Sequence, residues 1–371
     1  MKFSIGSKDR HSAARTGLAE VRGRTFPTPA FMPVGTAATV KGAMPRDLKE
    51  AGVSILLSNT YHLHLRPGED VVERAGGLHR FMNWDGAILT DSGGYQIFSL
   101  ADLVQIDDQG VTFRSHVDGN KIRLDPEGVV RIQRALGSDI AMVLDQCVKF
   151  PASREEAAAA EERTACWAER SIKALAGENT DMALFGIVQG GIYQDLRERS
   201  ARSLAQMGFS GHAIGGLSVG EGKDLMREVV AYTAPLLPEN KPRYLMGVGD
   251  PDDILDAVAL GIDMFDCVIP TRNARNATLF TRSGRMKLRN AGLKNDSAPP
   301  DPECACPLCS QFSRAYIRHL FNAHEMLGPI LATLHNIHFF QELMRDIRDA
   351  IGAGTFIPFR EAFLRRFQGK L

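Results

Sequence analysis

Cysteine is scarce and unevenly placed in this sequence. Only six of the 371 residues are cysteine, and three of them, Cys147, Cys166 and Cys267, lie far apart in apolar surroundings. This pattern excludes a disulfide framework and fits a reducing compartment. The first residues lack the apolar core of a signal peptide, and no apolar run reaches the roughly 18 residues of a membrane span. We therefore expect a soluble protein of the cytoplasm.

Net charge and nucleotide-binding loops are absent as well. Lys and Arg total 44, and Asp and Glu total 44, so the whole chain is not a polycation that would attract nucleic acid without specificity. No Gly-x-Gly-x-x-Gly turn opens a helix after a strand, and no phosphate-binding Walker A loop occurs. An open, nucleotide-binding sheet is therefore disfavoured.

The other three cysteines are crowded into six residues, as Cys304, Cys306 and Cys309. Thiolates this close repel one another unless a cation neutralises them, and three thiolates with one imidazole fill the tetrahedral shell of zinc. Such a shell leaves no position for water, so we expect a structural zinc site rather than free or disulfide-bonded cysteines. The spacing does not choose among the downstream histidines, which are His319, His324, His335 and His338.

Short apolar runs alternate with amphipathic, helix-like segments along most of the chain. The repeated strand–helix pattern predicts a parallel sheet, and about eight strands favour a (β/α)8 TIM barrel. The expected strands are Phe31–Val34, Ser54–Leu57, Ala87–Thr90, Ile140–Leu144, Ala183–Val188, His212–Gly215, Tyr244–Val248 and Met264–Val268. The expected helices include Pro126–Leu136, Arg154–Leu175, Asp195–Met207, Lys223–Pro235 and Pro251–Leu260. Asp125 and Asp250 each precede a proline, which is typical of a helix N-cap.

The cysteine cluster divides the C-terminal part from the barrel. We expect a catalytic barrel over residues 1–294, an inserted zinc-binding subdomain over 295–340, and a C-terminal helix over 341–371 that returns to the barrel.

Polar residues follow several of the expected strands. Asp91, Asp145, Gln189, Gly216 and Asp266 each stand at or after the end of an apolar run, and chemistry in a barrel sits at the carboxyl ends of its strands. Each has a plainer reading, because the aspartates could be N-caps and the glycines simple turns. Asp266 is the hardest to explain in this way. A carboxylate inside an apolar run costs several kcal/mol of desolvation free energy unless it has a functional role or a partner.

The set suits a purine-like ring attached to a sugar. A carboxylate and an amide can read the edge of the base, glycine lets backbone N–H groups approach closely, and Tyr95 can stack on the ring. Two further carboxylates suit attack at an anomeric carbon, one at the oxocarbenium-like centre and one moving a proton on the leaving group.

The sequence resembles the tRNA-guanine transglycosylases, in particular the bacterial form. The matching stretches are Ser58–Leu63, Thr90–Gln96, Gly186–Gly191, Ile214–Glu221, Asp263–Arg275 and Cys304–Cys309 with His335. The resemblance implies a (β/α)8 barrel with an inserted zinc subdomain. It also implies exchange of the wobble guanine in the anticodon loop of tRNAs with a G-U-N anticodon for the queuosine precursor preQ1, a 7-deazaguanine.

The resemblance assigns roles to individual residues. Asp266 looks like the nucleophile that forms a covalent ribosyl intermediate, and Asp91 like the general acid/base. The expected substrate-binding residues are Ser92, Tyr95, Asp145, Gln189, Gly216, the Leu217 backbone and Glu221, the last two receiving the aminomethyl group. Cys147 and Val219 match the bacterial base pocket. No redox cofactor or ATP is needed for a double displacement by a carboxylate.

The resemblance also identifies metal and subunit contacts. Cys304, Cys306, Cys309 and His335 match the ligands of one structural zinc ion, which leaves His319, His324 and His338 without a metal role. Tyr316 and His319 resemble a contact region of a homodimer.

A basic stretch runs from Arg272 to Lys294 and contains no acidic residue. Such runs are usually solvated loops. Here the stretch begins six residues after Asp266, which favours contact with RNA phosphates. Arg272 and Arg275, nearest to Asp266, are expected to hold the RNA backbone, and a target base flipped out of its stack would enter the pocket.

Two other functions compete with this interpretation. His62-x-His64 after a strand and an aspartate such as Asp266 at the end of the last strand are also seen in metal-dependent barrel hydrolases. In this sequence, Asp145, Gln189 and glycines stand where further histidines would be needed. The second alternative is a non-catalytic RNA-binding accessory subunit, and the presence of both Asp91 and Asp266 argues against it.

Overall fold

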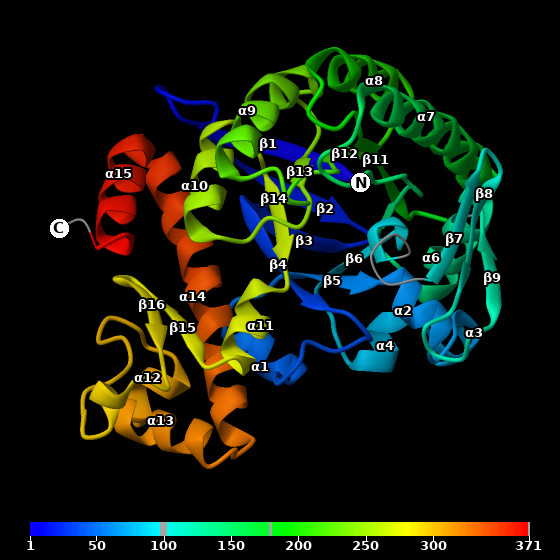
Figure 1. The fold of residues 1–371 in the computed structure, drawn as a ribbon. Coiled ribbons are helices and arrows are strands. Elements are labelled where there is room, and N and C mark those ends of the chain that lie inside the picture. The colour runs from blue at the N-terminus through cyan, green and yellow to red at the C-terminus, as the bar shows by residue number, and fades with distance from the viewer. Residues whose placement is uncertain (97–101, 178–179, 370–371) are drawn as a thin grey trace.

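The computed structural model describes residues 1–96, 102–177 and 180–369. Eight parallel strands close into a barrel (Figure 1), and each lies on one of the eight apolar runs predicted as strands. The predicted (β/α)8 barrel is therefore confirmed. In chain order the barrel strands are β4 (Ala30–Gly35), β5 (Ile55–Asn59), β6 (Ala87–Asp91), β10 (Ile140–Met142), β11 (Ala183–Val188), β12 (Gly211–Ile214), β13 (Arg243–Leu245) and β14 (Met264–Cys267), and β14 pairs with β4.

Helices follow the strands and form the outer layer of the barrel (Figure 1). These are α1 (Pro45–Glu50), α2 (Thr60–Leu65), α3 (Glu69–Arg74), α4 (Leu78–Met82), α6 (Pro126–Leu136), α7 (Arg154–Ala176), α8 (Gln194–Gln206), α9 (Lys223–Thr233) with the short 3-10 turn Ala234–Leu236, α10 (Pro251–Ala259) and α11 (Ile269–Arg275). Asp125 caps α6 by accepting from Gly128 N at 2.6 Å. Asp250 occupies the N-cap of α10 without a capping hydrogen bond, because its carboxylate pairs with Lys223 and Arg285 instead.

An N-terminal antiparallel sheet lies against the amino ends of the barrel strands. It consists of β1 (Lys2–Lys8), β2 (Arg15–Val21) and β3 (Arg24–Thr28). The buried Arg15 pairs at 2.7 Å with Asp263, directly before β14, and Arg24 pairs at 3.2 Å with Asp139, directly before β10. These ion pairs fix the sheet to the end of the barrel opposite the strand carboxyl ends.

A second small sheet interrupts the alternation after β6 and was not predicted. It contains β7 (Asp102–Asp107), β8 (Gly110–Arg114) and β9 (Lys121–Leu124). Val111 and Phe113 of β8 are buried in one apolar cluster with Trp167 of α7. The Trp167 indole N–H also donates to Asp108 O at 2.9 Å.

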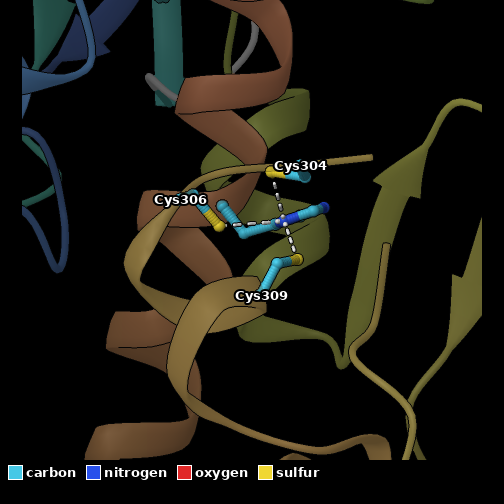
Figure 2. Close-up of side chains that lie close together, drawn as sticks. Cys304, Cys306 and Cys309 are labelled. Carbon is cyan, nitrogen blue, oxygen red and sulfur yellow. Dashed lines mark hydrogen bonds between the residues drawn. The ribbon is translucent and has the colours of Figure 1, made fainter. Parts of the chain in front are cut away.

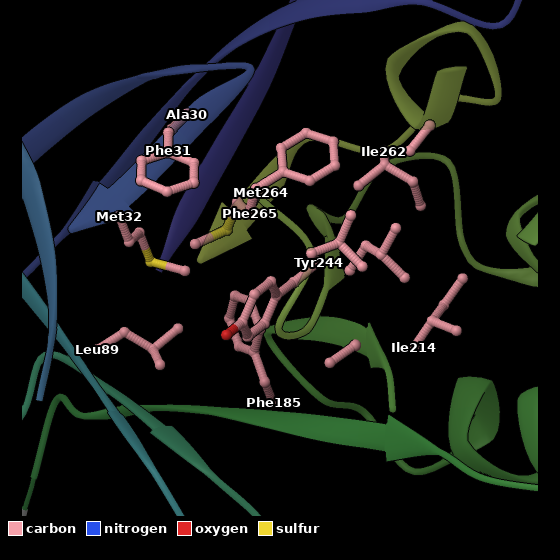
Figure 3. Close-up of a cluster of buried hydrophobic side chains, with 14 of the residues drawn as sticks. Ala30, Phe31, Met32, Leu89, Phe185, Ile214, Tyr244, Ile262, Met264 and Phe265 are labelled. Atoms are coloured by element: carbon pink, nitrogen blue, oxygen red, sulfur yellow. The ribbon is translucent and has the colours of Figure 1, made fainter. Parts of the chain in front are cut away.

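Large apolar side chains fill the barrel interior. Phe31, Phe185, Tyr244 and Phe265 are almost fully buried in one cluster (Figure 3). A filled interior leaves the loops at the strand ends as the place for chemistry.

The C-terminal part begins with a hairpin and ends in a long helix. It contains β15 (Thr278–Thr281), β16 (Gly284–Lys287), the 3-10 turn Ala291–Leu293, α12 (Pro307–Gln311), α13 (Arg314–Asn322), α14 (Leu327–Gly352) and α15 (Phe356–Phe367). Helix α14 runs from the cysteine-containing region up to α15 beside the barrel (Figure 1). The boundary expected at residue 340 thus falls inside one continuous helix, and the three-part division stays a prediction. Across the described residues, no helix is long and apolar enough to cross a membrane.

Candidate active site

A cavity of about 400 Å³ opens at the carboxyl ends of the barrel strands. Three carboxylates line it, from the end of β6 (Asp91), the loop after β10 (Asp145) and β14 (Asp266). The other expected residues on its wall are Ser92, Tyr95, Cys147, Gly216, Leu217, Val219 and Arg272. Barrel closure thus brings together side chains that lie far apart in sequence.

Asp91 is buried and receives three hydrogen bonds. The Asn59 side-chain amide donates to Oδ2 at 2.5 Å, the Thr60 backbone N–H donates to Oδ1 at 3.0 Å, and the Gln96 amide donates to Oδ2 at 3.1 Å. Burial nevertheless dominates and, with the charge of Asp266, raises the pKa of Asp91 to about 7. A carboxyl group with this pKa can release and take up a proton near neutral pH.

Asp266 is held through one of its two oxygens. The Tyr244 hydroxyl at 2.5 Å and the Gly247 N–H at 2.7 Å both donate to Oδ1. Within the described part of the chain, no group donates to Oδ2. Burial raises the pKa of Asp266, while these two donors favour its ionised form. Asp266 is therefore an oriented carboxylate with one oxygen free for bonding.

Asp145 lies between two polar side chains. Ser92 Oγ donates to its Oδ1 at 3.2 Å, and the Gln189 amide donates to its Oδ2 at 2.7 Å. Burial raises the pKa of Asp145 to about 6. Gln189 does not line the cavity itself, so in this structure it acts on the cavity through Asp145.

Gly216 requires glycine for two reasons. Its φ of +65° lies in the left-handed region, and a Cβ there would stand 2.4 Å from Gln189 Oε1. A side chain at this position would therefore disturb both the loop and Gln189.

Glu221 does not line the main cavity. Its carboxylate accepts the backbone N–H groups of Ser218 and Val219, the latter at 2.9 Å, and it borders a smaller neighbouring pocket with Gly216. Glu221 thus fastens the loop that carries Leu217.

Arg272 lines the cavity and Arg275 does not. Both are exposed on α11, and no carboxylate of the described residues is within ion-pair distance of either one. Elsewhere in the basic stretch, Arg282 pairs with Asp346 and Arg285 pairs with Asp250. The two arginines closest to Asp266 therefore remain available to an anionic ligand.

The sequence interpretation missed several residues of the site. Asn59, Tyr244 and Gln96 contact the two central carboxylates, and none of them had been given a role. Asn59 ends β5 and could have been found by the same strand-end rule that identified Asp91.

The cysteine cluster forms a compact ligand set with one histidine. The sulfur atoms of Cys304, Cys306 and Cys309 lie 3.7, 3.3 and 3.3 Å from His335 Nδ1 (Figure 2). His335 Nε2 lies 2.7 Å from Phe280 O, so a proton on Nε2 leaves Nδ1 free to bind a metal. These four residues could hold a metal ion, and the set is consistent with zinc. His319 and His324 belong to no candidate metal group of the described residues, whereas His338 forms a second group with Cys304 and Glu342.

The histidines of the hydrolase alternative do not form a metal site. His64 pairs with Glu69 at 2.7 Å, and His62 lines the cavity wall. No group of candidate metal ligands in the described residues includes His62, His64 or Asp266. The geometry therefore gives the hydrolase no support.

Comparison with known proteins agrees with the resemblance seen in the sequence. The queuine tRNA-ribosyltransferase family model matches residues 9–369. A queuine tRNA-ribosyltransferase of Pelotomaculum thermopropionicum is 55% identical over 369 residues, covering 100% of this chain and 99% of the relative. Proteins of the same name from Desulforamulus reducens and Listeria welshimeri are 54% and 52% identical, each over 99% of this chain and over 99% and 97% of their own lengths.

Proposed function

Because this chain belongs to the queuine tRNA-ribosyltransferase family, a family of transferases, we propose that it exchanges guanine at the wobble position of G-U-N anticodon tRNAs for preQ1. The observation that carries the proposal is the pair Asp91 and Asp266 in one cavity with different hydrogen-bond partners. Two carboxyl groups in different environments can divide nucleophilic and acid–base roles between them.

Asp266 acts as the nucleophile in this proposal. Tyr244 and Gly247 hold Oδ1, and Oδ2 bonds the anomeric carbon as the glycosidic C–N bond breaks and its electron pair leaves with guanine. The incoming base then attacks the same carbon and displaces Asp266, which retains the anomeric configuration.

Asp91 moves the proton. With a pKa of about 7, its carboxyl group can protonate the departing guanine and then, as a carboxylate, take a proton from the incoming base. One residue thus serves both halves of the exchange.

The base lies between recognition groups and a stacking ring. Asp145, oriented by Ser92 and Gln189, reads the N–H edge of the base, and the half-exposed Tyr95 stacks on its face. Gly216 offers a backbone N–H, while Cys147 and Val219 line the wall. The Leu217 backbone, held by the loop contacts of Glu221, receives the aminomethyl group of preQ1.

The RNA is held by charge beside the cavity. Arg272 and Arg275, which have no ion-pair partner in the described residues, contact the phosphates around the flipped base. This contact positions the anticodon loop without reading its sequence.

Zinc and a second copy of the chain complete the proposed enzyme. Cys304, Cys306, Cys309 and His335 hold one structural zinc ion, which links α12 to α14. Zinc leaves no open position in such a shell, so it takes no part in the exchange. Exposed Tyr316 on α13, near His319, forms part of a homodimer contact. A tRNA substrate implies activity in the cytoplasm.

Incorporation of labelled guanine into a G-U-N tRNA, without added cofactor, tests the exchange. The wild type should incorporate label and Asp266→Ala should not. Binding of tRNA without incorporation by the wild type would favour the accessory-subunit alternative. Absence of both binding and incorporation would contradict any action on tRNA.

For the acid–base assignment, Asp266→Asn should abolish the trapped covalent RNA complex. If Asp266→Asn still trapped RNA and Asp91→Asn did not, the two roles would be exchanged.

A further inference from the structure

A buried arginine without a carboxylate partner lies behind the base-recognition loops. Arg197, in the first turns of α8, is 0% exposed. Its Nε donates to Gly191 O at 2.8 Å, and one terminal nitrogen donates to Val188 O at 2.9 Å and to Gly215 O at 2.7 Å. The other terminal nitrogen is buried and has no hydrogen-bond partner. Among the described residues, no carboxylate lies within ion-pair distance of Arg197.

This arrangement is unfavourable for stability alone. A buried guanidinium normally has a carboxylate partner, as Arg15 has in Asp263. The amino-terminal turns of a helix also disfavour positive charge. Burial lowers the pKa of Arg197 to about 10, which still leaves the side chain charged at neutral pH. Its positive charge therefore stays beneath the loops after β11 and β12.

The Gly215–Gly216 peptide connects this charge to the cavity. In a trans peptide the C=O and the N–H point in opposite directions, so a Gly215 carbonyl that faces Arg197 directs the Gly216 N–H the other way. Gly216 lines the cavity, and its N–H donates to no group within the described residues. A peptide whose carbonyl accepts from a cation is a stronger donor at its N–H, because hydrogen bonds in a chain polarise one another.

We propose that Arg197 is a positioning residue for departure of the base, strengthening through this peptide the hydrogen bond from Gly216 N–H to the base carbonyl. Asp145 accepts from the N–H groups on the edge of guanine, and the carbonyl oxygen is the acceptor next to them. When the glycosidic bond breaks and Asp266 bonds the sugar, the electron pair stays on the base and spreads onto this oxygen. The proton from Asp91 later neutralises it. The inference rests on the proposed function and adds an electrostatic element to it.

The test compares guanine binding with catalysis. Arg197→Met removes the charge, Arg197→Lys keeps it, and Arg199→Met is the matched control, since Arg199 lies on the same helix and pairs with Glu161 and Glu162 outside the cavity. Calorimetry gives the affinity for free guanine, and the labelled-guanine exchange gives kcat and the KM for tRNA. Circular dichroism and thermal melting show whether each variant is folded.

We expect Arg197→Met to weaken guanine binding about 3- to 10-fold and to lower kcat about 100-fold. The larger loss falls on kcat because the negative charge exists only as the base leaves. Arg197→Lys should restore most of kcat, while the KM for tRNA and the Arg199→Met rates stay within about twofold of wild type.

With a folded Arg197→Met variant and an active wild type, two results would overturn the inference. If guanine affinity and kcat fell by the same factor, Arg197 would only stabilise the two loops. If guanine affinity and kcat both stayed at their wild-type values, Arg197 would have no role. If Arg197→Met does not fold, the Arg197→Lys variant provides the test. A folded lysine variant whose kcat falls by the same factor as its guanine affinity would contradict a role of the charge.

A wild type that binds guanine without exchanging it would instead refute the proposed function. If Arg197→Met then bound guanine as tightly as the wild type, the role of Arg197 would be refuted too.

Discussion

Tyr244 and Asp266 lie on the neighbouring strands β13 and β14, and the Tyr244 hydroxyl donates to Asp266 Oδ1 at 2.5 Å. The tyrosine ring belongs to the barrel core and is fully buried (Figure 3). A core residue thus holds the proposed nucleophile with almost no rotational freedom. The Gly247 N–H, donating to the same oxygen, leaves Oδ2 as the oxygen that bonds the sugar.

Tyr244→Phe should lower kcat for guanine exchange about 10- to 100-fold, because a hydrogen bond to a charged group is worth roughly 1.5–3 kcal/mol. Loss of the donor also raises the pKa of Asp266, so the acidic limb of the pH–rate profile should move to higher pH. Tyr193→Phe is the control, since its hydroxyl donates to Ala152 O outside the cavity. An unchanged rate and pH profile in Tyr244→Phe would show that Asp266 does not depend on this bond.

The raised pKa of Asp91 predicts that the folded protein loses stability as the pH rises. The folded protein holds this proton up to a pKa of about 7, whereas the unfolded chain releases it near 3.8. Between these values the folded state binds more protons, so the group costs stability progressively as pH rises, up to about 4 kcal/mol. Asp91→Asn removes that cost, so the variant should be more stable than the wild type. The difference in free energy of unfolding between variant and wild type should be roughly 1–3 kcal/mol larger at about pH 8 than at about pH 5.

Urea unfolding at the two pH values measures this difference, with exposed Asp181→Asn as the control. The control should change stability equally at both pH values. A gain for Asp91→Asn that is the same at about pH 5 and pH 8 would mean that Asp91 is ionised in the folded protein across this range. Asp91 would then be a poor general acid.

Much of the barrel could be predicted because its strands are short and almost wholly apolar. The run Ala183–Val188 is buried along its whole length, and polar Gln189 follows directly at its end. The convergence of Asp91, Asp145 and Asp266 follows from that pattern once the sheet closes. The small sheet β7–β9 escaped prediction because its strands mix charged and apolar residues, as Lys121–Leu124 does.

Contacts made by loop geometry could not be predicted from sequence. The Glu221 carboxylate accepts from the backbone of Ser218, whose φ of +59° turns the loop toward it. Cysteine spacing alone also left four histidines as candidates for the fourth metal ligand. The course of helix α14 distinguishes among them. That helix carries both His335 and His338 near Cys304, but only the His335 ring nitrogen lies near all three sulfur atoms.

Removal of the metal should destabilise the C-terminal part without altering chemistry directly. Cys306→Ser should lose the proposed zinc ion and lower Tm by several degrees, since metal that binds only the folded state stabilises it. Cys166→Ser, at an exposed free cysteine, should retain both zinc and Tm. Metal analysis and thermal melting measure the two effects. Full zinc content in Cys306→Ser would contradict the assignment of Cys306 as a ligand.

Arg272→Ala should weaken tRNA binding about 3- to 10-fold near physiological salt and reduce the slope of log affinity against log salt by about 1. The reason is that Arg272 lines the cavity mouth without an ion-pair partner in the described residues, so its charge remains available to a phosphate. Arg202→Ala, which breaks a surface pair with Glu198 on α8, should leave both quantities unchanged. Fluorescence anisotropy at several salt concentrations separates the two variants. If Arg272→Ala changed neither quantity, the RNA backbone would have to approach the cavity from a side away from α11.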